Sequence, residues 1–139
     1  MIDYNYETDF ELSSEARIST WLTQAILNEG FELGEISYVF CDDEYLHKLN
    51  VEFLNHDTLT DVISFDYSVG ELIQGDVFIS IERVKDNAKT FDVPFEDELH
   101  RVIIHGVLHY CGYKDKSKAE ADLMRDKENQ YLDMLKGLL

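Results

Sequence analysis

The alternation of two hydrophobic periodicities limits the fold of this chain more than any other feature of its sequence. Apolar residues that alternate or cluster as they do in strands occupy four segments, near residues 2–6, 36–40, 62–65 and 77–81. Apolar residues three and four positions apart, as in amphipathic helices, lie between the first three segments and after the last. The resulting order, β-α-β-α-β-β-α-α-α, predicts an α+β protein with a mixed sheet of about four strands and about five helices packed on it.

Residues that can cap a helix precede three of the helical patterns: Ser13 or Ser14, Asp42, and Ser117. Glu120 follows Ser117 at the spacing of a capping box, which should open the last helix. The apolar stripe of that helix contains one charged residue, Glu128, as its only irregularity.

A chain of 139 residues accommodates one hydrophobic core, so residues 1–139 are expected to form a single domain. No apolar run approaches the ~20 residues needed to cross a bilayer. The first residues lack the basic start and apolar stretch of a signal peptide. The two cysteines, Cys41 and Cys111, are too few for a disulfide framework, and we expect Cys111 to be a buried structural thiol. A cytoplasmic protein with no membrane partner is therefore expected.

The net charge of −17 at pH 7 argues against a uniformly basic surface of the kind that binds nucleic acids. The charge is unevenly distributed, because eighteen acidic residues but only two basic ones, Arg17 and Lys48, precede Arg83. From Arg83 onward, ten basic residues nearly balance eleven acidic ones. The first part should therefore have an acidic surface, while the second part can form a local basic one.

Two histidines four residues apart, His105 and His109, lie on one face of a predicted helix. Imidazoles at this spacing can chelate one metal ion. Gly112 can end the helix in a left-handed conformation, so that the chain turns back and Asp115 reaches the same ion. The pattern H-x-x-x-H-x-x-G-x-x-[H/D] is the ligand spacing of metzincin-type zinc sites, and three protein ligands leave a fourth position for water. We predict a catalytic metal site with these two histidines and Asp115 as ligands.

Gly106 follows the first histidine, where peptidases with an H-E-x-x-H motif carry the glutamate that acts as general base. Glycine cannot transfer a proton, so a peptidase of the standard mechanism is not expected. The remaining histidines have no partner at a ligand spacing, and we expect them at the surface: His47, His56 and His100.

Over nearly its whole length the sequence resembles the YbeY family of bacterial single-domain endoribonucleases. The family's H-G-x-L-H-x-x-G-Y segment corresponds to residues 105–109 with Gly112 and Tyr113. Its T-D-V-[IL]-S-F strand corresponds to residues 60–65, and its G-D-[VI] element to residues 75–77. Together these motifs are far more specific than the histidine pair alone.

The resemblance implies an α+β fold and a metal-dependent, single-strand-specific endoribonuclease that acts in 3′-end maturation of small-subunit ribosomal RNA and in ribosome quality control. It also implies one zinc ion per chain, or another divalent transition metal. The implied partners are single-stranded ribosomal RNA and ribosomal proteins. Bases of single-stranded RNA can stack on aromatic side chains, for which the candidates are Tyr67, Tyr110 and Tyr113; core or rim positions are the equal alternative for these tyrosines. Asp61 and Asp76 are interpreted as turn formers outside the site.

Two positions depart from the family pattern. Asp115 replaces the family's third histidine; aspartate is an acceptable zinc ligand but favours weaker binding or another ion. Leu54 replaces the arginine that commonly follows an aromatic residue shortly before the T-D-V strand. Arg101, one turn before His105, is a candidate catalytic residue for holding phosphate, and a solvated helix residue is the alternative interpretation.

The sequence leaves several alternatives open. Basic residues expected to contact phosphate, unless they are scattered solvated side chains, are Arg101, Lys114, Lys116, Lys118 and Arg125. The nucleophile can be a metal-bound hydroxide or the 2′-hydroxyl of the RNA. Two other functions compete with the nuclease: a metallopeptidase with an unusual base, and a non-catalytic ribosome-assembly factor with a structural metal site. The missing arginine and the acidic surface favour that second alternative over catalysis.

Overall fold

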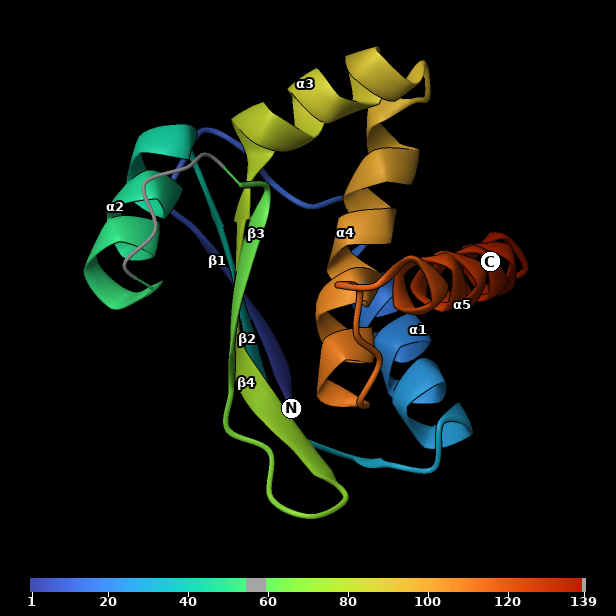
Figure 1. Cartoon of the computed structure of the whole chain (residues 1–139). Coiled ribbons are helices and arrows are strands. Elements are labelled where there is room, and N and C mark those ends of the chain that lie inside the picture. Colours follow the sequence, from blue (N-terminus) through green and yellow to red (C-terminus); the bar gives the residue numbers. More distant parts are fainter. Residues whose placement is uncertain (55–59, 139) are drawn as a thin grey trace.

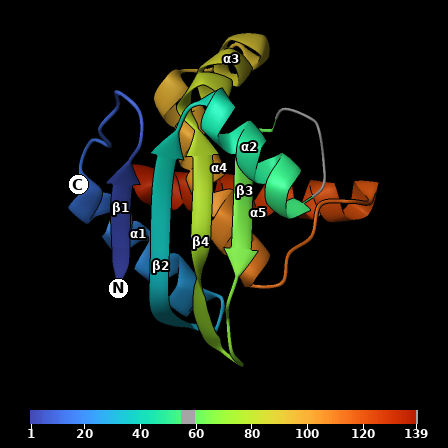
Figure 2. The same cartoon turned by 90° about the vertical axis from the view of Figure 1, so that its left-hand side faces the viewer.

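The computed structural model describes residues 1–54 and 60–138, which form one four-stranded sheet and five helices in the predicted order. The strands and helices are β1 (Ile2–Tyr6), α1 (Glu15–Asn28), β2 (Glu32–Cys41), α2 (Asp43–Leu54), β3 (Val62–Asp66), β4 (Leu72–Ser80), α3 (Ile81–Phe91), α4 (Phe95–Tyr110) and α5 (Lys118–Lys136). The strand order is β1-β2-β4-β3, as Figure 2 shows. Because β1, β2 and β4 run parallel while β3 is antiparallel to β4, the sheet is mixed and the predicted fold class is confirmed.

The helices cover the two faces of the sheet unequally. In Figure 1, α1, α4 and α5 lie on one side of the sheet, α2 lies on the other, and α3 crosses its end. The side chains that alternate along β2 and β4, such as Tyr38 and Val77, point into the large apolar core beneath α1 and α4. The face under α2 holds a small separate cluster of Cys41, Leu46 and Ile63.

Two of the three predicted helix caps form. The Asp42 carboxylate accepts a hydrogen bond from the Tyr45 amide at 2.8 Å, and Ser117 and Glu120 form the complete capping box. The predicted serine cap of α1 is wrong, because Ser14 takes the N-cap position with a positive φ of 60° and its side chain makes no capping hydrogen bond. Its left-handed backbone directs the hydroxyl away from the amides of the first turn.

Helix α5 is joined to α1 by bonds from side chains to backbone carbonyls. The Trp21 indole donates to the carbonyl of Tyr131 at 2.7 Å, and the Arg17 guanidinium donates to the carbonyls of Leu135 and Leu138. Leu138 lies just beyond the end of α5, and the Leu135 carbonyl also accepts from the Leu138 amide, so Arg17 adds side-chain donors to the carbonyls at this helix end. The contacts fix α5 across the end of the core.

Helix α4 lies very close to strand β4. A Cβ atom built on Gly106 comes within 3.1 Å of a methyl group of Val77, which is tighter than an ordinary contact. Gly106 is buried and faces the sheet, so the two histidines on either side of it lie on a different face of the helix. Among the described residues, no helix is both long and apolar enough to span a bilayer.

Candidate metal centre

The three predicted ligands converge at the C-terminal end of α4. The Nε2 atoms of His105 and His109 are 2.9 Å apart, and Asp115 Oδ2 lies 3.3 Å from the first and 3.5 Å from the second. An ion about 2.0–2.1 Å from tetrahedrally arranged donors separates them by about 3.3 Å. The donor set therefore fits one metal ion, and the group could hold one.

The turn after α4 brings Asp115 back to the histidines. Helix α4 ends at Tyr110, and Gly112 adopts the left-handed conformation predicted for it, with φ of 102°. Residues with a side chain avoid this conformation, so glycine permits the reversal. The carbonyl of Tyr113 then lies 2.9 Å from His109 Nδ1, which leaves Nε2 of that ring directed toward the other ligands.

Glu128 is a residue of the site that the sequence analysis missed. Its carboxylate, from the middle of α5, lies with Oε2 2.7 Å from His105 Nδ1 and with Oε1 3.0 Å from Arg101 Nη1. Its side chain is only 5 % exposed. The one available signal was the irregularity itself, a carboxylate in an apolar helical stripe.

The two histidines have opposite electrostatic environments. Burial lowers the pKa of His105, but the hydrogen bond and charge of Glu128 outweigh it and the pKa is raised. Burial and the charge of His105 together lower the pKa of His109. Burial raises the pKa of Glu128, yet the bonds from His105 and Arg101 outweigh it and the pKa is lowered. Without an ion, the arrangement favours an ionised His105–Glu128 pair beside a neutral His109.

A cavity of about 250 Å³ opens beside the ligands. Its lining includes His105, Asp115, Arg101 and Glu128, together with Asp61 from the residue before β3. A larger cavity of about 670 Å³ adjoins it and shares four lining residues: Phe91, Glu98, Arg101 and Arg125. A substrate therefore has access to the site from one side.

Arg101 lines this cavity, but its charge is already paired. It contacts Glu128 at 3.0 Å and Glu98 at 3.9 Å, and its side chain is 21 % exposed. Arg125 is also close to Glu128, at 3.5 Å, while Lys118 pairs with Asp122 away from the ligands. The predicted basic surface is therefore interleaved with carboxylates, and Lys114 and Lys116 are exposed residues of the turn.

The sequence indicates that Asp61 is a turn former outside the site, but the structure places it on the cavity wall. Its carboxylate accepts a hydrogen bond of 3.4 Å from the Asn87 side chain. Burial raises its pKa above the ordinary value of a carboxyl group. Asp76 faces the opposite side of the sheet from Val77 and does not line the cavity.

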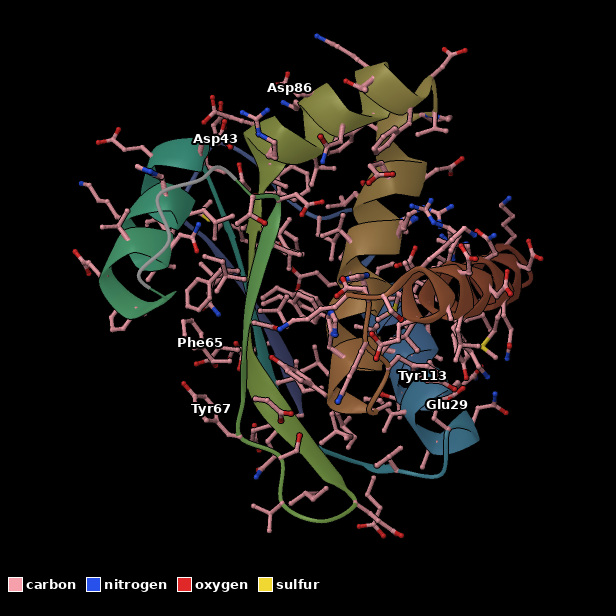
Figure 3. The ribbon with its side chains drawn as sticks, in the orientation of Figure 1. Glu29, Asp43, Phe65, Tyr67, Asp86 and Tyr113 are labelled. Atoms are coloured by element: carbon pink, nitrogen blue, oxygen red, sulfur yellow. The ribbon has the colours of Figure 1, made fainter. Side chains whose placement is uncertain are left out.

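The three tyrosines proposed for base stacking do not form a common platform. Tyr110 is buried, and its hydroxyl lies within 3.1 Å of the carbonyls of Phe65 and Asp76, so it has a structural role. The Tyr113 hydroxyl donates to Glu29 at 2.6 Å. Figure 3 shows Tyr67 across the sheet from Tyr113. The stacking prediction is therefore wrong for Tyr110 and not supported as a group.

Other predicted surface and core positions also need correction. The side chain of His100 is only 12 % exposed and packs edge-on against Trp21, because it lies on the face of α4 toward α1. His47 is half-buried, and His56 lies outside the described residues. The Cys111 thiol is half-buried, where burial raises its pKa to about 12.

Comparisons with known proteins agree over almost the entire chain. A family model described as Endoribonuclease YbeY matches residues 3–136. A protein named Endoribonuclease YbeY from Flavobacterium johnsoniae is 63 % identical over 134 residues, which cover 96 % of each chain. A namesake from Flavobacterium psychrophilum is 60 % identical with the same coverage. The solution structure of a Thermotoga maritima protein superposes with a TM-score of 0.70 and 25 % identity, over 99 % of this chain and 90 % of the other.

Proposed function

Because the chain belongs to the YbeY family of endoribonucleases, we propose that it cleaves single-stranded RNA internally with the aid of one metal ion. The observation that carries this proposal is the convergence of His105, His109 and Asp115 beside an open cavity. We propose small-subunit ribosomal RNA as the substrate, in 3′-end maturation and ribosome quality control. This role requires the bacterial cytoplasm, where ribosomes are assembled.

Zinc fits the donor set, and other divalent transition metals accept the same combination of imidazole and carboxylate. When bound, such an ion supplies Lewis-acid catalysis and water activation at neutral pH. The residues of the chain supply the remainder. Arg101 lines the cavity where it can contact a phosphate oxygen, and Asp61 can exchange a proton with a group bound there.

The activity can be tested with a matched pair of histidine variants on α4. The zinc-loaded protein should cleave single-stranded RNA, His109→Ala should lose that cleavage, and His100→Ala, which removes a partly buried histidine outside the ligand group, should retain it. Undiminished cleavage by purified His109→Ala would show that the nuclease is a contaminant. Replacing the 2′-hydroxyl at the cut site by hydrogen distinguishes the two nucleophiles, because only attack by the 2′-hydroxyl requires that group.

The role of Asp115 can be tested by metal content rather than by activity. Asp115→Ala should lose the ion or bind it far more weakly, whereas Asp115→His should retain it. Asp122→Ala removes an exposed carboxylate of α5 as a control. Unchanged affinity in Asp115→Ala would mean that another group completes the coordination.

The metallopeptidase alternative is disfavoured by the packing of Gly106. The standard peptidase base would occupy this position, yet Gly106 is buried against Val77 and faces the sheet. A glutamate there would meet β4 and could not reach the cavity. The site therefore lacks the general base of the standard peptidase mechanism at this position.

The binding-factor alternative is favoured by two observations, the leucine at position 54 in place of the family's arginine and the acidity of residues 1–82. We propose that this part recruits basic ribosomal proteins, which would compensate for weak unassisted binding to RNA. Direct phosphate contacts should come from the second part. Reversing the charge of Lys114 and Lys116 together should lower the slope of log affinity against log salt by about two, one for each contact. An unchanged slope would exclude this basic patch.

A further inference from the structure

Glu128 occupies a buried position, where an ionised carboxylate is energetically unfavourable. It is buried among apolar residues of α5, between Met124 and Tyr131, and its side chain is 5 % exposed. Burying a charge is unfavourable unless partners compensate for it, and replacing a buried ion pair by apolar side chains is often neutral or stabilising. Packing of α5 therefore does not explain a glutamate here.

The partners of the carboxylate explain it better. One oxygen binds the Nδ1 side of His105, and the other binds Arg101 Nη1. A hydrogen bond at Nδ1 fixes the tautomer and the ring orientation of a histidine, so that Nε2 is presented to a metal. Glu128 thus contacts both a proposed ligand and the cation that lines the substrate cavity.

The second histidine is held in a different way. His109 Nδ1 contacts the carbonyl of Tyr113 in the turn, a neutral acceptor. A carboxylate increases the basicity of its imidazole more than a carbonyl does. The two ligands are therefore unequal, and His105 depends on a charged side chain that belongs to another helix.

Helix α5 is fixed well enough to place that side chain. The capping box at Ser117 sets its start, and the bond from Trp21 to the carbonyl of Tyr131 ties it to α1 three residues after Glu128. Figure 1 shows α5 lying beside α4 and α1 on the same side of the sheet. The carboxylate therefore contacts α4, while the helix that carries it is bonded to α1.

We propose that Glu128 is a positioning residue that orients His105 for metal binding and holds Arg101 at the cavity, coupling the ligand to the phosphate-contacting group. The proposal rests on the proposed function for the role of Arg101. The orientation of His105 requires only that the group binds a metal ion.

The experiment compares three variants by zinc affinity, measured by competition with a chelator, and by unfolding of the metal-free protein. Glu128→Gln keeps the shape of the side chain and should weaken zinc binding by about 10–100-fold. Glu128→Met removes all polar contacts and should bind zinc more weakly still, although its metal-free form remains folded. The matched control is Glu98→Gln, a buried carboxylate of α4 that lines the same cavity and contacts Arg101.

Glu98→Gln should bind zinc within about twofold of the parent protein, because Glu98 is linked to Arg101 and not to a ligand. Equal affinities for the parent, Glu128→Gln and Glu98→Gln would overturn the proposal. So would a loss of zinc in Glu128→Met that only follows the unfolded fraction.

A second readout concerns Arg101. With zinc saturating, Glu128→Gln and Arg101→Gln should each raise KM for RNA, and the double variant should show less than the product of the two effects. Independent, multiplicative effects would remove Arg101 from the proposal. If zinc binding depends on Glu128 but the parent protein does not cleave RNA, the proposed function fails while the orientation of His105 stands.

Discussion

On one face of the sheet, α1, α4 and α5 cover a large apolar core, whereas α2 alone covers the other face over Cys41, Leu46 and Ile63. We call the face covered by α1, α4 and α5 the thick side and the face covered by α2 alone the thin side. On the thin side, Phe53 of α2 is 63 % exposed, although its ring still contacts Phe65. Both faces belong to one sheet, so they differ in the depth of packing and not in the backbone that supports them.

The proposed site lies entirely on the thickly packed side. His105 and His109 project from α4, Glu128 from α5, and Asp115 from the turn between them. Ligands must be held to within about 0.5 Å for metal chemistry, and side chains on rigid, well-packed helices meet this requirement better than loops do. The position of the ligands therefore depends on the packing of α1, α4 and α5, and we expect substitutions under α2 to leave it unchanged.

The largest expected losses of unfolding free energy come from truncating one buried leucine side chain on each side of the sheet. Leu22 on α1 and Leu46 on α2 are both almost fully buried. Leu→Ala substitutions cost about 2–5 kcal/mol of unfolding free energy, depending on how far the surroundings collapse. Leu22→Ala should lie near the upper end of this range and Leu46→Ala near the lower end, as measured by urea unfolding.

The zinc affinities of the same two variants separate effects on the site from effects on stability. Leu46→Ala should bind zinc as the parent protein does, since α2 supplies no group of the site. Equal losses of zinc affinity in Leu46→Ala and Leu22→Ala would show that packing on both faces of the sheet supports the site to the same extent.

The next effect concerns the bond that ties α5 to α1. Trp21→Phe keeps an aromatic ring in the core but removes the indole N–H that donates to the carbonyl of Tyr131. Loss of one such hydrogen bond costs about 0.5–1.5 kcal/mol, so the unfolding midpoint should fall. Because α5 carries Glu128, zinc affinity should fall as well. A loss of stability with unchanged zinc affinity would show that α5 keeps its place without this bond.

A smaller effect should come from Asp61, because burial raises the pKa of its carboxyl group in the folded protein. The folded protein therefore loses stability as pH rises from the pKa of this group in the unfolded chain, about 3.9, to its higher pKa in the folded state. Metal-free Asp61→Asn should therefore be more stable than the parent at pH 7, and the difference should disappear below pH ~4. Asp66→Asn, at the exposed end of β3, is the control. A difference independent of pH would contradict this explanation.

The smallest expected effect is a change in the rate at which an alkylating reagent labels Cys41. The Cys41 thiol is fully buried under α2, and burial raises its pKa to about 12. Both features make it unreactive toward alkylating reagents in the native protein. If the thin side opens locally, urea below the unfolding transition should speed labelling of Cys41 before stability is lost. Labelling of Cys41 only with global unfolding would mean that α2 opens with the whole domain.

The sequence predicted the features that depend on residues close together in the chain. The order of strands and helices follows from periodicity, and the capping box and the turn at Gly112 follow from spacings of three residues. The convergence of His105, His109 and Asp115 could be anticipated because all three lie within eleven residues.

The sequence did not predict features that depend on contacts between distant segments. Glu128 is 23 residues from His105, and the sequence shows it only as one charged residue that interrupts an apolar stripe. Asp61 is separated from the ligands by three intervening structural elements, and no local pattern shows that it lines their cavity. The burial of His100 against Trp21 depends in the same way on how α1 packs on α4.

The hydrogen bonds between α1 and the C-terminal segment can form only late in the synthesis of the chain. Chains leave the ribosome from the N-terminus, so α1 with Arg17 and Trp21 emerges long before the carbonyls that they bind in α5. The two histidines also emerge before Glu128. A nascent chain without α5 lacks the carboxylate that orients His105, and the complete site forms only after α5 has been synthesised.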